Sequence, residues 1–280
     1  MIEGVRFTGG TAMTRLISAL WLITSVAAGT AWAQPFPTNE AGVTMGHLHL
    51  NSRDVEANRK IFVAMGGAAT KAGDFDIVRF PGVNVYLHLR PGAPPPTGGN
   101  DGTVVHQVGF AVQDIQGTID RLKTAGIPVE VGGTPNQAFL STSDGLRIAI
   151  VEDKAQALPI QHHHVQFFVA EQAIPEIQAW YAKLFGARPG IQGESSIAEI
   201  PGANLRFAKT DTPTATTKGR VLDHIGFDVK NLEAFLQKLE AAGIKLDRPY
   251  TKNPLTNSAL AFIYDPWGTY IELNERPGTP

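Results

Sequence analysis

One pattern occurs four times along this chain, and it constrains the fold more than any other feature. Each copy has a strand-like run, a helix-capping position, a short amphipathic helix and a glycine where the helix stops. Repeats at a fixed spacing of about sixty residues indicate four copies of one supersecondary unit. The copies are GHLHLNSRDVEANRKIFVAMGG, HQVGFAVQDIQGTIDRLKTAGI, HHVQFFVAEQAIPEIQAWYAKLFGA and DHIGFDVKNLEAFLQKLEAAGI, with stop glycines Gly66, Gly126, Gly186 and Gly243.

Local signals predict the elements within each copy. Asp54, Asp114 and Asn231 offer side-chain oxygens where three of the helices should begin. In the third copy Pro175 stands where a first-turn proline is tolerated. Strand-like runs follow each glycine, and Gly, Pro and Asp residues set hairpin turns before the final strand of each copy. The predicted unit is therefore βαβββ, and its last strands lie in PGVNVYLHL, DGLRIAIVE, PGANLRFAK and DPWGTYIEL.

The connections between copies suggest a division into domains. The Pro- and Gly-rich stretches RPGAPPPTGGNDGT and TDTPTATTKG are interpreted as separating the units of one pair, and EDKAQALPIQ as separating the two pairs. This predicts an α+β fold of four βαβββ units in two paired domains, residues 42–155 and 160–276.

The N-terminus is typical of a secretory signal peptide. Arg15 precedes the apolar run LISALWLITSVAA, and AWA follows with small residues at the positions that a signal peptidase reads. We expect residues 1–33 to be removed by cleavage near Ala33–Gln34, and Met13 is a candidate for the true start, which the sequence leaves open. The chain has no cysteine, which excludes disulfides and thiolate metal sites. Export to a periplasm, or secretion, is the predicted localisation.

Composition narrows the classes of partner. A formal net charge of -2 with interspersed signs gives no electrostatic footprint for nucleic acid or an anionic membrane. No stretch after the signal peptide approaches the length of a membrane helix. We expect the mature chain to bind a small molecule, and homo-oligomer formation is left open.

The repeated unit resembles that of the vicinal oxygen chelate superfamily, which includes glyoxalase I, bleomycin-resistance proteins and extradiol dioxygenases. Strings such as DHIGFDV and DPWGTYIEL carry the resemblance, which covers essentially the whole mature chain. It implies that two units pair so that their curved sheets enclose a cup. It also implies that metal ligands come from the first and last strands of each unit.

Aligning the four copies places one residue of each strand at a ligand position. The first strands contribute His47, Gln107, His164 and His224, and the last strands contribute Tyr86, Ala149, Arg206 and Glu272. In the second domain, the resemblance to the dioxygenases predicts His164, His224 and Glu272 as ligands of one divalent metal. Two imidazoles and a carboxylate favour Fe(II) or Mn(II), with Zn(II) or Ni(II) as alternatives. Each residue alone would be interpreted as an ordinary strand residue.

Two further residues are candidates for catalysis. Arg206 cannot bind a metal, and it is interpreted either as holding a substrate carboxylate or phosphate or as forming a surface ion pair. The dioxygenase tyrosine position is filled by Phe262, so Tyr264, which should share its strand face, is the candidate proton-transfer residue. This departure from the dioxygenase pattern weakens a prediction of ring cleavage.

The remaining histidines allow several interpretations. In the first domain His49 and His88 share faces with His47 and Tyr86, which leaves a displaced second metal site as the alternative to a degenerate scaffold domain. In the triplet before the third strand, His164 is the predicted ligand. His162 should face the same way, and His163 the opposite way.

The function favoured by these features is that of an exported metal-dependent enzyme. Its substrate would carry adjacent oxygen atoms, and its chemistry would be dioxygenation or a glyoxalase or lyase type of reaction. The first alternative is a non-catalytic protein that binds or sequesters a small molecule, as bleomycin-resistance proteins do. The second is a structural module whose metal only stabilises the fold. A shared fold does not decide among these.

Overall fold

The computed structural model describes residues 1, 4, 36–88 and 94–279. Apart from residues 1 and 4, the predicted signal peptide lies outside the described residues, so cleavage and export stay predictions. No helix within the described residues has the length and apolar character needed to cross a membrane.

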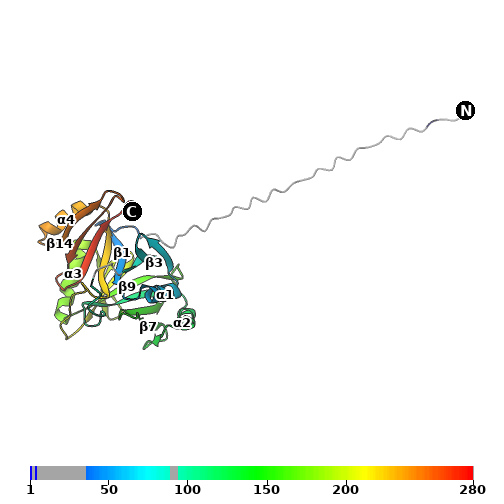
Figure 1. Ribbon diagram of the computed structural model, residues 1–280, viewed down its shortest axis with the longest axis horizontal. Coiled ribbons are helices and arrows are strands. Elements are labelled where there is room, and N and C mark those ends of the chain that lie inside the picture. The colour runs from blue at the N-terminus through cyan, green and yellow to red at the C-terminus, as the bar shows by residue number, and fades with distance from the viewer. Residues whose placement is uncertain (2–3, 5–35, 89–93, 280) are drawn as a thin grey trace. The chain divides into compact units, whose positions relative to one another are not determined.

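The fold is of the predicted α+β class, with two eight-stranded sheets (Figure 1). In spatial order the first sheet contains β14 (Leu246–Asn253), β15 (Ser258–Tyr264), β16 (Tyr270–Glu275), β13 (Leu222–Val229), β1 (Val43–Asn51), β4 (Val83–His88), β3 (Phe75–Phe80) and β2 (Ala68–Ala72). The second contains β10 (Arg188–Gln192), β11 (Ser195–Ile200), β12 (Ala203–Lys209), β9 (Ile160–Val169), β5 (Val105–Val112), β8 (Arg147–Glu152), β7 (Gln137–Ser141) and β6 (Glu130–Val131).

Four α-helices follow the first strands of the four units. They are α1 (Val55–Met65), α2 (Ile115–Thr124), α3 (Ile174–Phe185) and α4 (Leu232–Ala241). The predicted caps are present, since the Asp54, Asp114 and Asn231 side chains each accept a hydrogen bond from a backbone N–H in the first helical turn. Helix α3 has no side-chain cap and is preceded by the short 3-10 helix η2 (Glu171–Ala173). Each unit therefore has the βαβββ order that its sequence predicts.

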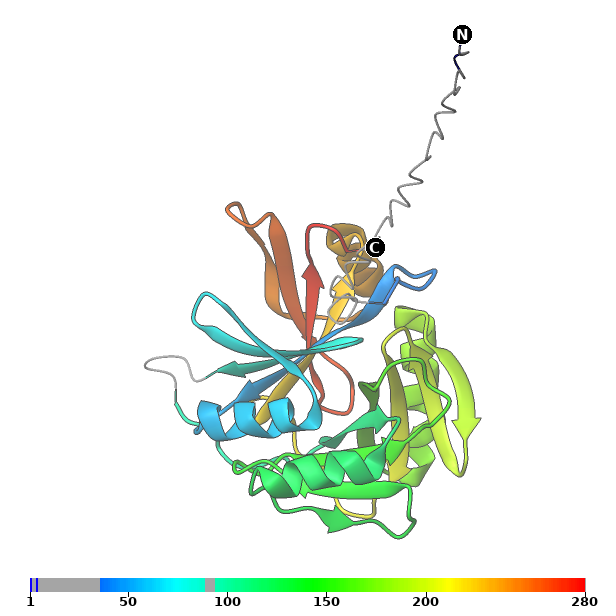
Figure 2. The ribbon, with the colours of Figure 1, turned by 90° about the vertical axis from the view of Figure 1, so that its right-hand side faces the viewer.

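The sheets do not pair the units as the sequence suggested. Strand β1 of the first unit pairs antiparallel with β13 of the fourth, and β5 of the second pairs antiparallel with β9 of the third. Figure 2 shows the blue and cyan strands of the first unit beside the gold, orange and red strands of the fourth. The predicted division into residues 42–155 and 160–276 is therefore wrong, because each sheet takes one unit from each half of the chain.

The connections explain this pairing. The shortest, residues 153–159, joins β8 to β9 within one sheet, and it is tied down where Asp153 N–H donates to Val112 O and Gln113 N–H to Pro159 O. The longer connections, residues 89–104 and 210–221, join one sheet to the other. Parts of these two lie side by side, since Val104 N–H donates to Ala215 O. A short connection suits units that share a sheet, whereas the Pro- and Gly-rich stretches cross between sheets.

Each central strand pair contains bulges that change which side chains share a face. On β13 the extra residue is Asp223, because His49 pairs with His224 and Leu50 with Leu222. On β9 the extra residue is His163, because Gly109 pairs with His164 and Phe110 with His162. A bulge breaks the simple alternation of a strand and redirects the side chain of the extra residue.

Two glycines let an imidazole lie across the neighbouring strand. A Cβ atom on Gly226 would lie 2.0 Å from the His47 ring, and one on Gly109 would lie 2.0 Å from the His164 ring. Neither glycine has a positive φ, so the requirement is space and not backbone conformation. The two positions correspond in the repeat, which shows that both sheets are built around the same contact.

We predict that Gly226→Ala and Gly109→Ala each destabilise the fold by about 1–3 kcal/mol, the usual cost of overpacking a tight interior. The measurement is chemical denaturation. Gly190→Ala is the matched control, because its Cβ would meet Ile197 at an ordinary 3.5 Å. Equal stabilities for the Gly190 and Gly226 variants would contradict this account of the central strand pair.

Candidate metal centre

Three buried donor groups converge on the first sheet. The His224 Nε2 and Glu272 Oε2 atoms are 2.7 Å apart, and the His47 Nε2 and Glu272 Oε2 atoms are 3.4 Å apart. His47 lies on β1, His224 on β13 and Glu272 on β16, so the first and fourth units both contribute. His47 and His224 are almost fully buried, and 13% of the Glu272 side chain is exposed.

Two further side chains complete what we call the histidine–carboxylate centre, made of His47, His49, Tyr86, His224 and Glu272. The His49 ring stacks on the His224 ring with centroids 4.4 Å apart. His47, His49 and His224 each have one ring nitrogen within 4.8 Å of the others. The Tyr86 ring lies 5.0 Å from the His47 ring. The centre thus offers three imidazoles, one carboxylate and one phenol.

The bulge on β13 orients His224. It brings the Asp223 Oδ1 atom to 2.6 Å from His224 Nδ1, so Nδ1 carries a proton and donates a hydrogen bond to the carboxylate. Burial alone would lower the pKa of His224, but the contacts with Asp223 and Glu272 outweigh burial and raise it. Without a metal, Asp223 and Glu272 therefore favour the protonated form of His224.

The other groups of the centre have displaced pKa values as well. Burial alone would raise the pKa of Glu272, but contacts with His224 and His47 hold it well below its usual value. Burial lowers the pKa of His47, and Glu272 offsets this only in part. Burial and the charges of His224 and His47 lower the pKa of His49 well below its usual value. His47 and His49 are therefore neutral near pH 7.

Arg276, just after β16, reaches back to this centre. Its Nη1 atom donates to the Tyr86 hydroxyl at 3.1 Å, and its Nη2 atom lies 3.3 Å from His47 Nδ1. Since a guanidinium only donates, His47 Nδ1 accepts, and His47 Nε2 carries the proton that faces Glu272. Arg276 also forms an ion pair with the buried Asp228 at 3.3 Å.

The donor set fits a divalent metal after a small rearrangement. Ligand bonds of roughly 2.0–2.2 Å place two donors of one metal roughly 3.0–3.5 Å apart, which brackets the His47–Glu272 distance. His224 Nε2 is buried and has no aligned hydrogen-bond partner, although Glu272 pairs with it by charge. A metal would replace the His224 Nε2 proton while Asp223 keeps the Nδ1 proton in place. Ligation by His47 Nε2 requires its other tautomer, so Arg276 has to shift.

A cavity of about 690 Å³ opens onto the centre. The hairpins β2–β3 and β14–β15 wall it, and its surface is both aromatic and polar. The lining residues include His47, His49, Phe75, Tyr86, Arg248, Asn253, Ser258, Phe262, Glu272, Asn274 and Arg276. This volume suits a small organic molecule.

The predicted triad of His164, His224 and Glu272 is not assembled. His224 and Glu272 contact each other, but His164 lies on β9 in the second sheet, opposite Gly109. Arg206, on β12, lies in the second sheet too. The ligand positions inferred from the repeat do come together, but first-unit residues take the place expected for third-unit residues. His47, attributed above to a degenerate domain, therefore stands where His164 was expected.

Tyr264 does not reach this centre. It is the last residue of β15, and its ring packs on Tyr270 and lies near Lys218. Phe262, two residues earlier, lines the cavity and lies edge-on to His224. The shared strand face was predicted correctly, but β15 ends beyond the cavity. No contact among the described residues joins Tyr264 to an imidazole of the centre or to Glu272.

The second sheet carries its own cluster, which we call the arginine centre: Gln107, His163, His164 and Arg206. The Gln107 Nε2 and His164 Nε2 atoms are 3.4 Å apart, and the Nδ1 atoms of His163 and His164 are 2.8 Å apart. His163 was expected to point away from His164. That prediction is wrong, because His163 is the bulged residue.

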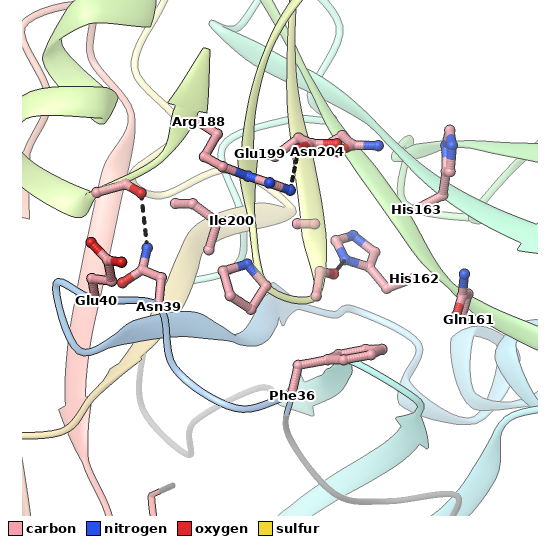
Figure 3. Close-up of a pocket in the computed structure, with 14 residues that line it drawn as sticks. Phe36, Asn39, Glu40, Gln161, His162, His163, Arg188, Glu199, Ile200 and Asn204 are labelled. Atoms are coloured by element: carbon pink, nitrogen blue, oxygen red, sulfur yellow. Dashed lines mark hydrogen bonds and ion pairs between the residues drawn. The ribbon is translucent and has the colours of Figure 1, made fainter. Parts of the chain in front are cut away.

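The first histidine of the triplet has a third environment. His162 Nδ1 donates to Gly202 O at 2.8 Å, and its buried Nε2 has no partner among the described residues. Figure 3 shows His162 in a cavity of about 670 Å³ together with Phe36, Asn39 and the Arg188–Glu199 ion pair. The triplet therefore contributes His162 and His163 to this cavity wall, and His163 and His164 to the arginine centre.

Two residues that contact the histidine–carboxylate centre were not anticipated. Asp223 directly precedes His224, so simple alternation would point it away, and a bulge leaves no clear signal in a single sequence. Arg276 follows the last strand and reaches the centre only through tertiary folding. The HLH run that places His49 two residues after His47 did indicate a shared face.

Comparisons with known proteins agree with this fold. The sequence model of the Glyoxalase/Bleomycin resistance protein/Dioxygenase superfamily matches residues 131–273, just over half of the chain. Glyoxalase I from Zea mays matches with a TM-score of 0.64 and 18% identity, covering 83% of this chain and 92% of that one. A proposed dioxygenase from Bacillus subtilis matches with a TM-score of 0.61 and 14% identity, covering 88% and 87%. The sequence matches no curated protein.

We predict that His162 makes the fold sensitive to mild acid. Burial lowers the pKa of His162 from 6.5 to about 4. The unfolded chain therefore takes up a proton as the pH falls through 6.5, whereas the folded chain does so only near 4. The free energy of unfolding contributed by neutral His162 is therefore lost as the pH falls from 6.5 to about 4, and the loss is on the order of 2–3 kcal/mol.

The variant His162→Asn, which keeps a donor for Gly202 O, should lose less stability across this window. The measurement is the free energy of unfolding at about pH 7.5 and about pH 4.5. His106→Asn is the control, because His106 is only half-buried and should contribute less. The same acid loss in wild type and His162→Asn would rule out this role for His162.

Proposed function

Because the chain belongs to the glyoxalase/bleomycin resistance protein/dioxygenase superfamily, we propose that it is a metal-dependent enzyme acting on a small molecule with two adjacent oxygen atoms. The observation that carries this proposal is the convergence of His47, His224 and Glu272 at a cavity of about 690 Å³. Two imidazoles and one carboxylate leave coordination positions open for such a substrate. We favour Fe(II) or Mn(II), with Zn(II) or Ni(II) as alternatives.

The bound metal would act as a Lewis acid and template for the substrate oxygens. His47, His224 and Glu272 would hold it, and Asp223 would fix the tautomer of His224. His49 is the closest further candidate for a ligand, because one of its nitrogens lies within 4.8 Å of those of His47 and His224. We assign it a different role, because the carboxylate already contacts the other two imidazoles.

His49 is the proposed general base. It is neutral near pH 7, because burial and the charges of His224 and His47 lower its pKa, and it lines the cavity. A neutral imidazole beside bound substrate can accept a proton from a carbon next to an oxygen. The Tyr86 hydroxyl, polarised by Arg276, would donate a hydrogen bond to the oxygen on which negative charge develops.

These roles favour proton transfer of the glyoxalase type over ring cleavage. Proton transfer needs the base and an oxyanion donor, which His49 and Tyr86 provide on the first unit. Ring cleavage in related dioxygenases depends on a tyrosine at the position of Phe262, and Tyr264 lies beyond the cavity. The aromatic wall of Phe75 and Phe262 suits a substrate with an apolar or aromatic part.

A second candidate is a protein that binds a small molecule without a reaction. The observation that favours it is that the polar groups of the centre already have partners within the protein. Glu272 pairs with two histidines, and Arg276 contacts His47 and Tyr86. Such a cavity is complete without a metal. This candidate predicts that metal-free protein stays folded and binds ligand as well as metal-loaded protein does.

We predict about one tightly bound divalent metal per chain, measured by elemental analysis of protein purified without a histidine tag. His47→Ala, His224→Ala and Glu272→Ala should each abolish binding, because each removes a donor from a three-ligand set. Asp223→Asn should weaken binding by roughly 10- to 100-fold, because it removes the group that orients His224.

His164→Ala is the matched control for this prediction, since His164 occupies the corresponding strand position in the other sheet. It should keep the full metal content. If His164→Ala loses the metal while His47→Ala keeps it, the assignment of the centre to the first and fourth units is wrong. If none of the variants changes the metal content, the binding-protein candidate is favoured.

We predict that His49→Asn retains the metal but slows the reaction by a factor of about 10² to 10⁴, the usual contribution of a positioned proton-transfer group. The assays are thiohemiacetal turnover for the glyoxalase type and oxygen uptake with a panel of catechols for the dioxygenase type. Loss of metal from His49→Asn would instead identify His49 as a ligand.

A further inference from the structure

The arginine centre of the second sheet contains a cation without a counter-charge. Arg206 is half-buried, and its Nη2 atom donates to the Ser195 hydroxyl at 3.0 Å. Its Nε atom is buried and has no partner among the described residues. No carboxylate in the described part of the chain lies within ion-pair distance of its guanidinium. A guanidinium stays protonated, so this position retains an uncompensated positive charge.

The residues beside Arg206 present hydrogen-bond donors. As placed, the Gln107 amide nitrogen donates to His164 Nε2, so the proton of His164 is on Nδ1. The His164 Nδ1–H then donates a hydrogen bond to His163 Nδ1 at 2.8 Å, which places the proton of His163 on Nε2. The hydrogen bonds run from Gln107 to His164 and from His164 to His163. They leave the Nε2–H of His163 available to a ligand.

The charges in this centre are consistent with that arrangement. Burial, followed by the charges of His163 and Arg206, lowers the pKa of His164 well below its usual value. Burial also lowers the pKa of Arg206, and no neighbouring carboxylate opposes this. Both imidazoles are neutral near pH 7, so the centre carries one positive charge, from Arg206.

A cavity gives access to the same face of the sheet. Residues paired across antiparallel strands point to the same side, so Asn204, Glu199 and Arg188 lie in a row next to that of Arg206 and Ile197. The cavity of about 670 Å³ in Figure 3 is lined by this row and by His163. His163 therefore belongs both to the wall of this cavity and to the arginine centre.

We infer that the second sheet holds a separate binding site for a small oxyanion, a carboxylate or a phosphate, with Arg206 as its charged anchor. An oxyanion supplies the acceptors that the Arg206 Nε and the His163 Nε2–H lack, and its charge balances the guanidinium. Arg206 thus fills, in the second sheet, the ligand position that Glu272 fills in the first. Equivalent positions of the repeat thus present acceptor groups suited to a cation in the first sheet, and donor groups suited to an anion in the second.

The test uses the full mature chain and inorganic phosphate as the probe, with acetate as a second arm and sodium chloride at equal ionic strength as the reference. Phosphate binding is measured by calorimetry and by the rise in melting temperature. Arg206→Met should weaken phosphate binding by about tenfold or more. In phosphate-free buffer the same variant should melt no lower than wild type, because it removes an unpaired, half-buried charge.

Arg248→Met is the matched control, because Arg248 lines the cavity of the first sheet. It should bind phosphate like wild type, and Arg206→Lys should retain part of the binding. Stronger binding of phosphate than of acetate would identify a dianion site, and the reverse a carboxylate site. The inference fails if phosphate does no more than chloride, if Arg248→Met abolishes the effect, or if Arg206→Met melts lower because the guanidinium is a structural contact.

The outcome of the phosphate-binding test does not depend on the proposed metal centre. Arg206→Met should leave the metal content unchanged, and His224→Ala should leave phosphate binding unchanged, because the two residues lie on different sheets.

Discussion

The antiparallel contact between β1 and β13, and its counterpart between β5 and β9, is the interaction on which both candidate sites depend. Each contact joins two βαβββ units into one sheet, and each places an imidazole of one unit over a glycine of the other. Because neither unit has the donors of a complete site, the site exists only where two units meet. The chemistry of each sheet is therefore decided by which units pair.

The residues at bulges in these contacts decide whether each centre presents hydrogen-bond acceptors or donors. At the same bulged position the first sheet has Asp223 and the second has His163, and each side chain meets the Nδ1 atom of the histidine that follows it. A carboxylate there leaves His224 Nε2 directed at Glu272, as a metal ligand would be. An imidazole there makes His163 the last donor of a neutral hydrogen-bonded series. The residue at this bulged position, together with Glu272 or Arg206 on the last strand, thus distinguishes the proposed metal site from the proposed anion site.

Much of the fold was predictable from the sequence, because repeat spacing, helix caps and turn glycines are local signals. The caps at Asp54, Asp114 and Asn231 are present as predicted, and the α+β class and superfamily are confirmed. The strand positions that converge in each sheet were predictable too, but the units that combine there were not. Gly109 and Gly226 both offer space for an imidazole, so the repeat does not say which units pair. Asp223 and Arg276 depend on a bulge and on a tertiary contact, and neither leaves a periodic signal.

The pairing of first and last units has a consequence for biosynthesis. The contact between His47 and Arg276 joins residues 229 positions apart, and among the described strands β4 is the one partner of β1 in its own half of the chain. The second and third units can pair once the third unit, which follows the short connection 153–159, has been synthesised, because that contact is local in the sequence. The sheet with the histidine–carboxylate centre has to wait for β13 and β16, near the C-terminus. An unfinished chain therefore holds an exposed edge strand and lacks part of the set of side chains that we propose as metal ligands.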